Sequence, residues 1–239
     1  MIRKPLSITS VQLGDAAASR ISAWRQNLTA LASDGIAGVS ESDFLGCELR
    51  AAATVAALAE LERMLRELLV ATADEVNSAS VKVRDLVPAL RGLASQAQFQ
   101  AIAESSKSDQ HWEGRQLVTR LELSEEIARL PVRSSSTPQP PLDGRTIRAA
   151  HLQRLWTVLG LPEQAIPRAP LEVSLNALST LRNDIAHGNA PIGELFHPDV
   201  PGKSARQIEA HLENLERLID HVALAFHEYG KSRLYRISA

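Results

Sequence analysis

Residues 204–230 read SARQIEAHLENLERLIDHVALAFHEYG. Because an α-helix has about 3.6 residues per turn, apolar side chains that alternate steps of four and three fall on one helical face. This stretch has that pattern over three heptads, at Ile208, Leu212, Leu215, Ile219, Val222, Phe226 and Tyr229. A helix with one apolar face must bury it against another element. The stretch therefore predicts a long helix packed within a helical bundle.

A second long helix is expected over residues 41–72. Its apolar positions follow the same spacing, at Cys47, Ala51, Thr54, Leu58, Leu61, Leu65 and Leu68. Ser40 or Ser42 could cap its first turn, where acidic side chains also favour the positive end of a helix. We expect these two long helices to be the main packing elements of the bundle.

Shorter helices complete the predicted fold. The spacing indicates helices around residues 13–31, 147–159 and 171–187, and short ones near 80–95 and 110–130, broken at Pro88. Proline-rich loops are expected at 131–144 and 189–202, because proline cannot continue a helix. With no strand-like alternation and no internal repeat, the chain is predicted to be an all-α antiparallel helical bundle forming one domain over residues 1–239.

Composition agrees with this fold class and narrows the location. The 239 residues are 44% hydrophobic and 23% charged, with 4% aromatics, so Leu and Ala dominate and favour helices. A single cysteine, Cys47, excludes an intrachain disulfide and a cysteine-based metal cluster. No apolar run is long enough to span a membrane, and the first residues do not form a secretory signal, so a cytoplasmic protein without membrane contact is expected. The net charge of −2 means that any nucleic acid must bind to a local basic patch.

The usual motifs of cofactor and metal enzymes are missing from the sequence. It has no glycine-rich phosphate loop, no GxSxG and no HExxH. His211, His221 and His227 lie on the last predicted helix, but they are too far apart or point apart. We therefore expect neither a metal nor a cofactor.

Arg182 interrupts an apolar stripe on the predicted helix 171–187. Leu171, Leu175, Leu178 and Ile185 share one face, and Arg182 takes the position expected to be apolar. Arginine stays charged and is costly to bury alone, so an anionic group should lie near it. A carboxylate, a position at the bundle rim, or a bound phosphate would each meet this need.

His187 follows five residues later, directly before Gly188, which is placed to end the helix. On a continuous helix the side chains of Arg182 and His187 point about 140° apart. Local unwinding, or a second subunit, could bring them into one cleft. An arginine that offsets phosphate charge and a histidine that moves a proton form a sensible minimal set for RNA cleavage.

The stretch RNDIAHG at residues 182–188 resembles the signature of the HEPN superfamily (higher eukaryotes and prokaryotes nucleotide-binding). That signature is an arginine, a polar residue, three to five further residues, and a histidine. Together with LWTVLGLP (155–162) and LSTLRNDIAHG (178–188), it is similar to stand-alone bacterial HEPN proteins of defence and toxin–antitoxin loci, most sharply over 143–190. The resemblance implies catalytic roles for Arg182 and His187 and supporting roles for Asn183 and Asp184.

The resemblance also implies an activity and partners. Many HEPN proteins are metal-independent endoribonucleases that use the RNA 2′-hydroxyl as nucleophile and leave a 2′,3′-cyclic phosphate. They commonly act as homodimers, as toxins with a cognate antitoxin, or as abortive-infection effectors in anti-phage defence with a partner protein. Two alternatives stay open: a non-catalytic HEPN module that binds a nucleotide or a partner protein, and a helical scaffold.

Spacing alone does not single out this pair. Two further Arg–His pairs have a permitted spacing, Arg145 with His151 and Arg206 with His211, but neither has an asparagine after the arginine. We interpret them as solvated residues on helix faces. RNA binding would need local basic residues, and the ring of Tyr235 could stack on a base. The candidates are Arg133, Arg145, Arg148, Arg154, Lys231, Arg233 and Arg236.

Overall fold

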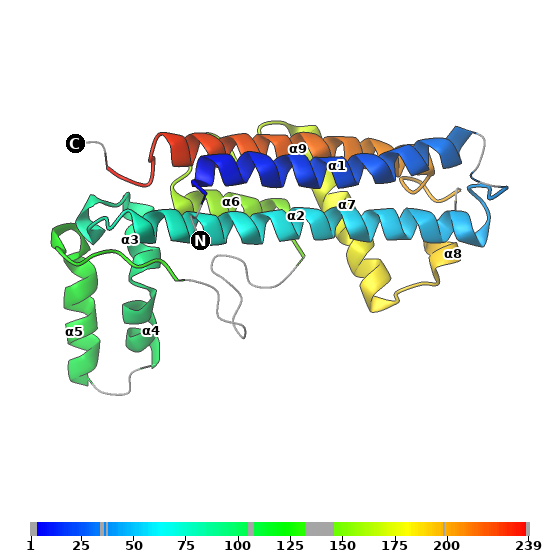
Figure 1. Cartoon of the computed structure of the whole chain (residues 1–239). Coiled ribbons are helices and arrows are strands. Elements are labelled where there is room, and N and C mark those ends of the chain that lie inside the picture. Colours follow the sequence, from blue (N-terminus) through cyan, green and yellow to red (C-terminus); the bar gives the residue numbers. More distant parts are fainter. Residues whose placement is uncertain are drawn as a thin grey trace.

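Three long helices lie side by side along the molecule in a computed structural model (Figure 1). The structure describes residues 4–33, 36, 38–104, 108–131, 146–197 and 199–237. The long helices are α1 (Leu6–Ser33), α2 (Phe44–Ser78) and α9 (Ala205–Lys231). α1 runs antiparallel to both of the others, while α2 and α9 run in the same direction. In the described ranges there are only isolated bridges and no extended strand, which confirms the all-α antiparallel bundle.

The closest helix packing joins α1 to α9. A Cβ atom built on Gly14 would stand only 2.6 Å from the Cβ of Ala223, so the two backbones approach because Gly14 has no side chain. The predicted apolar face of α9 is buried throughout, from Ile208 to Tyr229. At one edge Arg25 donates to Glu209 at 2.8 Å and to Glu216 at 2.6 Å. The pattern in residues 204–230 therefore specifies the centre of the bundle.

α2 begins at Phe44, and the residue at its N-cap differs from the predicted one. Asp43 is the N-cap, and neither Ser40 nor Ser42 caps the helix. The carboxylate of Asp43 turns back instead and accepts from the backbone N–H of Ser40 at 2.7 Å. The prediction of a serine cap was wrong because the helix begins at Phe44, which puts Asp43 at the N-cap position, and the hydroxyls of Ser40 and Ser42 bond to each other at 2.9 Å.

A fully buried arginine anchors the start of α2. Arg50 donates to the carboxylate of Glu41 at 3.1 Å, to the carbonyl of Glu41 at 2.8 Å and to the carbonyl of Lys203 at 2.9 Å. A buried charge is tolerated when it is paired and its donors are satisfied. Arg50 therefore ties the α1–α2 connection to the start of α9.

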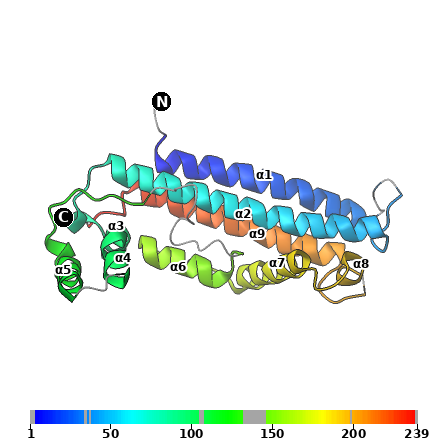
Figure 2. The same ribbon diagram turned by 90° about the horizontal axis from the view of Figure 1, so that it is seen from below.

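Three further helices lie beneath the long ones (Figure 2): α6 (Ala149–Leu159), α7 (Ala169–His187) and α8 (Ile192–Leu195). α7 packs against α2 and α9, as its apolar stripe requires. The proline-rich stretch 189–202 contains the single turn α8 rather than only loop, because Pro191 sits at the N-cap, where its missing N–H costs nothing.

The chain between α2 and α6 forms short elements at one end. These are η1 (Val83–Asp85), α3 (Pro88–Ala94), α4 (Gln96–Glu104), α5 (Ser108–Thr119) and η2 (Leu121–Leu123). α4 and α5 form a hairpin that projects from the bundle (Figure 1). Pro88 begins α3, where proline is favoured. Apart from Pro131, the predicted loop 131–144 lies outside the described residues. None of the helices in the described ranges is long and apolar enough to cross a membrane.

Candidate functional site

α7 stays helical up to His187 and then stops abruptly. Gly188 adopts a left-handed conformation with φ +61°, which glycine takes without steric cost. Its N–H donates to the carbonyl of Ile185, and the N–H of Asn189 donates to the carbonyl of Asp184, both at 3.2 Å. These two bonds form a Schellman motif. The predicted glycine stop is therefore confirmed.

Arg182 lies on the flank of the apolar face of α7. The buried position in this turn is filled by Leu181, and Arg182 is half-buried beside it. Among the residues that the structure describes, Arg182 makes no hydrogen bond and no ion pair. Of the three alternatives for Arg182, a carboxylate partner is not found in this part of the chain, whereas its half-buried place on the flank agrees with a position at the bundle rim and leaves its donors available to a phosphate.

His187 is exposed as the last residue of α7. Because the helix is regular through this residue, the side chains of Arg182 and His187 leave it about 140° apart. The proposed local unwinding before His187 is therefore wrong, since the chain leaves the helix only at Gly188. One copy of the chain does not bring the two side chains together on one face.

A row of polar side chains on α7 fastens the segment that leads into α6. Asn176, Ser179 and Asn183 share one face through their spacing of three and four residues. They hold residues 146–149 against α7 close to Arg182. The three bonds run from the Ala149 N–H to Asn176 Oδ1 (3.3 Å), from the Ser179 hydroxyl to the Ile147 carbonyl (2.5 Å) and from the Thr146 hydroxyl to Asn183 Oδ1 (2.7 Å). Sequence reasoning missed this row, although the polar 3–4 spacing was its signal.

The two supporting residues thus have defined contacts. Asn183 is engaged by Thr146 through its oxygen, which leaves its Nδ2 group as a donor. Asp184 accepts from the side-chain amide of Asn189 at 3.0 Å and so braces the turn after His187.

The other two histidines with permitted spacing are half-buried and not solvated as predicted. His151 accepts from the backbone N–H of Arg148 at 3.0 Å at the start of α6. His211 lies 3.0 Å from the hydroxyl of Ser174 on α7, and burial lowers the pKa of His211. His211 is half-buried because it lies where α9 packs against α7. Arg145 lies outside the described residues.

The candidate RNA-binding residues do not form one surface. Arg148 is exposed at the N-cap of α6 and lies beside α7, only two residues after Thr146. Lys231, Arg233 and Arg236 lie at the far end of α9, which is 27 residues long and therefore spans about 40 Å. Arg133 also lies outside the described residues. Among the candidates that the structure describes, Arg148 lies close to the segment that the polar row of α7 holds, whereas Lys231, Arg233 and Arg236 do not.

Tyr235 cannot stack an RNA base in this conformation. Its side chain is fully buried, and its ring lies 6.1 Å from that of Tyr229. The segment after α9 folds back on the chain before α3, where Val87 N–H donates to the carbonyl of Tyr235 at 3.0 Å. The predicted stacking role is wrong because this long-range pairing buries the ring.

Within the described ranges, no group of three or more His, Cys, Asp or Glu side chains is placed to hold a metal ion. The arrangement at the end of α7 offers different chemistry. It presents an unpaired guanidinium, an amide donor and an exposed imidazole, which together suit an anionic substrate that gains or loses a proton.

Comparison with known families identifies the class of protein. A family model described as MAE_28990-like HEPN matches residues 48–235, so the chain belongs to the HEPN superfamily and, within it, to this family. The match runs from α2 to the segment after α9 and includes the motif at 182–188, while α1 precedes it. Membership implies a nucleotide- or RNA-related function. No curated protein and no solved structure matches the chain significantly.

Proposed function

We propose that the protein is a metal-independent endoribonuclease that leaves 2′,3′-cyclic phosphate ends. The observation that carries the proposal is Arg182, a half-buried arginine with no anionic partner among the described residues, five positions before the exposed His187. A phosphodiester is the kind of anion that the planar guanidinium fork binds well. Membership of a superfamily that includes ribonucleases supports the same conclusion.

The chemistry needs one proton acceptor and one proton donor. The RNA 2′-oxygen attacks the adjacent phosphorus, and the bond from phosphorus to the 5′-oxygen of the next nucleotide breaks. The 2′-hydroxyl loses its proton as that bond forms, and the departing 5′-oxygen gains one. His187 fills one of these two roles, as general base or acid, because imidazole gains and loses a proton near neutral pH, and solvent water accepts or supplies the other proton. Arg182 stabilises the charge on the phosphorane-like transition state.

The geometry of α7 favours a homodimeric site. Arg182 and His187 point about 140° apart on one helix, so a single chain offers the phosphate only one of them at a time. A two-fold axis beside the end of α7 would place His187 of one protomer opposite Arg182 of its partner. Asn183 and Asp184 hold the surrounding backbone, and among the candidate RNA contacts that the structure describes, Arg148 lies close to this site, two residues after Thr146.

The proposed biological role is that of a toxin or abortive-infection effector in the cytoplasm. A nuclease with so small a set of reacting groups would need outside control, for which a cognate antitoxin or a defence-system partner is the proposed source. A toxic effect on expression that His187→Ala abolishes would support this role.

The direct test is cleavage of a labelled RNA by the full chain in EDTA, followed by analysis of the product ends. The proposal predicts undiminished cleavage and 2′,3′-cyclic phosphate ends. A strict requirement for added divalent metal, with 3′-hydroxyl products, would contradict it. Absence of cleavage by the folded dimer would instead favour a non-catalytic module that binds a nucleotide or a partner protein.

A further inference from the structure

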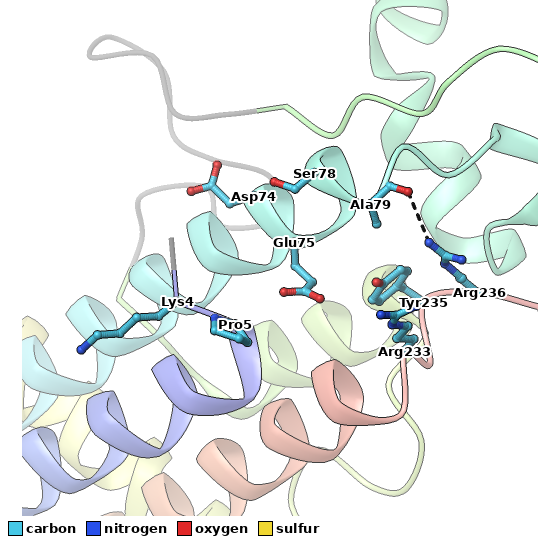
Figure 3. Close-up of a pocket in the computed structure, with 9 residues that line it drawn as sticks. All are labelled: Lys4, Pro5, Asp74, Glu75, Ser78, Ala79, Arg233, Tyr235 and Arg236. Carbon is cyan, nitrogen blue, oxygen red and sulfur yellow. Dashed lines mark hydrogen bonds between the residues drawn. The ribbon is translucent and has the colours of Figure 1, made fainter. Parts of the chain in front are cut away.

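A cavity of about 400 Å³ lies at the opposite end of α9 from the α7–α8 turn. Three parts of the chain line it: the segment before α1, the last turn of α2 and the segment after α9 (Figure 3). Its size lies within the range of small-molecule sites, although near the lower end. Of the residues discussed for RNA binding, only Arg233, Tyr235 and Arg236 of the last segment are among the described residues that line it.

Two buried polar atoms of this cavity have no hydrogen-bond partner. The hydroxyl of Tyr235 belongs to a fully buried side chain, and the Nε–H of Arg236 is also buried; neither atom makes a hydrogen bond of normal distance and angle, although the Arg236 guanidinium lies close enough to the Tyr235 hydroxyl to interact with it. Buried polar groups are normally satisfied, so an orphan in a cavity points to a group that binds there. Nε–H can only donate, and a phenol hydroxyl readily donates, so an acceptor would satisfy both.

The described lining of the cavity carries charges of both signs: α2 contributes Asp74 and Glu75, and basic side chains come from Lys4, Arg233 and Arg236. Arg233 and Arg236 come from the last segment, and the Arg236 guanidinium lies 5.7 Å from the ring of Tyr235 while donating to the carbonyl of Ala79 at 3.3 Å. Glu75 faces them from α2. Figure 3 shows its carboxylate and the hydroxyl end of Tyr235 turned toward the same space. Burial and the charge of Glu75 raise the pKa of Tyr235, so the hydroxyl keeps its proton.

The backbone conformation at Arg233 also favours a binding site here. Arg233 has φ +50°, a left-handed conformation that favours glycine, at the point where α9 ends. At the end of α7 the same conformation is given to Gly188. Here the chain instead places an arginine whose side chain lines the cavity.

We propose that this cavity binds a small molecule that carries an oxyanion and an ammonium group. The oxyanion, a phosphate or a carboxylate, accepts from Tyr235, Arg236 and Arg233. The ammonium group donates to the carboxylate of Glu75. Because the cavity presents both acidic and basic side chains, it favours a ligand that carries both groups. A ligand with one group alone would leave either Glu75 or the basic side chains without a partner.

The experiment measures binding of four probes to the full-length protein by calorimetry and thermal shift. O-Phosphoethanolamine and β-alanine carry both charges, with a phosphate or a carboxylate as the anion. Inorganic phosphate and ethanolamine each carry one. The proposal predicts that at least one two-charge probe binds, and binds roughly tenfold or more tighter than either one-charge probe. The better of the two identifies the oxyanion.

Substitutions place the binding in this cavity. Tyr235→Phe removes an unpaired buried hydroxyl, so it should raise the melting temperature of the free protein while weakening the two-charge probe roughly tenfold. Glu75→Gln keeps an acceptor for the Leu6 N–H, which the carboxylate accepts at 3.3 Å, and should weaken the same probe. Lys231→Ala is the control, because Lys231 is exposed and pairs only weakly, at 3.8 Å, with Glu228.

Three results would overturn the proposal. The first is binding of none of the four probes. The second is binding that Tyr235→Phe leaves unchanged. The third is inorganic phosphate that binds as tightly as O-phosphoethanolamine and is insensitive to Glu75→Gln. Each can be told apart from failure of the nuclease proposal, because RNA cleavage is not used as the readout.

Discussion

The hydroxyl of Thr146 donates a 2.7 Å hydrogen bond to Oδ1 of Asn183, the residue that follows Arg182. Thr146 is buried, and it is the first residue of the described segment that leads into α6. The bond couples two stretches of chain that are 37 residues apart at the point where the candidate site begins. Asn183 therefore fixes backbone around Arg182 and holds its own amide in one orientation.

Loss of this bond should lower stability and, more mildly, activity. Thr146→Val keeps the shape but leaves Asn183 Oδ1 unpaired, which we expect to cost about 1–2 kcal/mol in free energy of unfolding. RNA cleavage should fall several-fold, well short of the loss in His187→Ala. Urea unfolding and cleavage assays check both. The control is Thr180→Val on the same helix, since the exposed Thr180 hydroxyl donates only to a carbonyl of its own helix. Equal effects of the two variants would contradict the coupling.

Substitutions of Arg182 should show whether RNA cleavage needs only its positive charge or also its planar shape. Arg182→Ala should reduce cleavage roughly 10²-fold or more, because a phosphate contact in a partly buried site is hard to replace with water. Arg182→Lys should recover only part of this, since lysine lacks the planar two-donor fork. Arg206→Ala, which removes an exposed arginine from α9, should leave cleavage within a few-fold of wild type. Full rescue by lysine would show that a point charge suffices and would contradict the bidentate contact.

Mixed dimers should reveal whether two protomers share one site. If His187 of one protomer acts with Arg182 of its partner, a dimer of one Arg182→Ala chain and one His187→Ala chain keeps one complete pair. Such a dimer, purified with two different affinity tags, should recover about half of the wild-type rate, whereas each homodimer stays inactive. A mixed dimer as inactive as its parents would show that the pair does not act across the interface.

His211 should make stability depend on pH. Burial lowers the pKa of His211 below the ordinary histidine value of about 6.5, so the unfolded chain binds a proton more readily than the folded one. The free energy of unfolding should therefore be highest above about pH 6.5 and should fall as the pH drops through that value toward the lower folded pKa. His211→Asn should remove this part of the decline in urea unfolding followed from about pH 7.5 to 5.5. A variant that declines as steeply as wild type would contradict the assignment, with His197→Asn, at an exposed site, as the control.

Gly14 should be intolerant of even one methyl group. A Cβ there would lie 2.6 Å from the Cβ of Ala223, so Gly14→Ala must push α1 away from α9. We expect a loss of about 1–3 kcal/mol in free energy of unfolding, although alanine favours helices. Gly92→Ala is the matched control in α3, because nothing lies within 4 Å of its added Cβ. It should be neutral or stabilising, and denaturant unfolding of both variants checks the contrast.

The sequence predicts those parts of the fold that rest on local periodicity. α9 and α2 follow from apolar residues in steps of four and three, and the end of α7 follows from Gly188, because these signals act within one or two turns. α4 escaped prediction because its nine residues are too few for a repeated apolar spacing to stand out. The cap at Asp43 escaped because several polar side chains compete there for the same backbone groups.

The candidate site was predictable only in part, for a similar reason. Arg182 and His187 stand out in the sequence, and the helix end was placed correctly. The tether through Thr146 and the burial of Tyr235 depend on pairings between distant segments, which no local pattern carries. The same holds for His211, whose half-buried state arises only when α9 meets α7.

The central claim is that His187 moves a proton during RNA cleavage. The most direct measurement is the cleavage rate of His187→Ala relative to wild type, in EDTA, with His197→Ala as an exposed-histidine control and circular dichroism to confirm folding. The account predicts a loss of roughly 10²- to 10⁴-fold for His187→Ala and little change for His197→Ala. A folded His187→Ala variant that cleaves RNA as fast as wild type would contradict it.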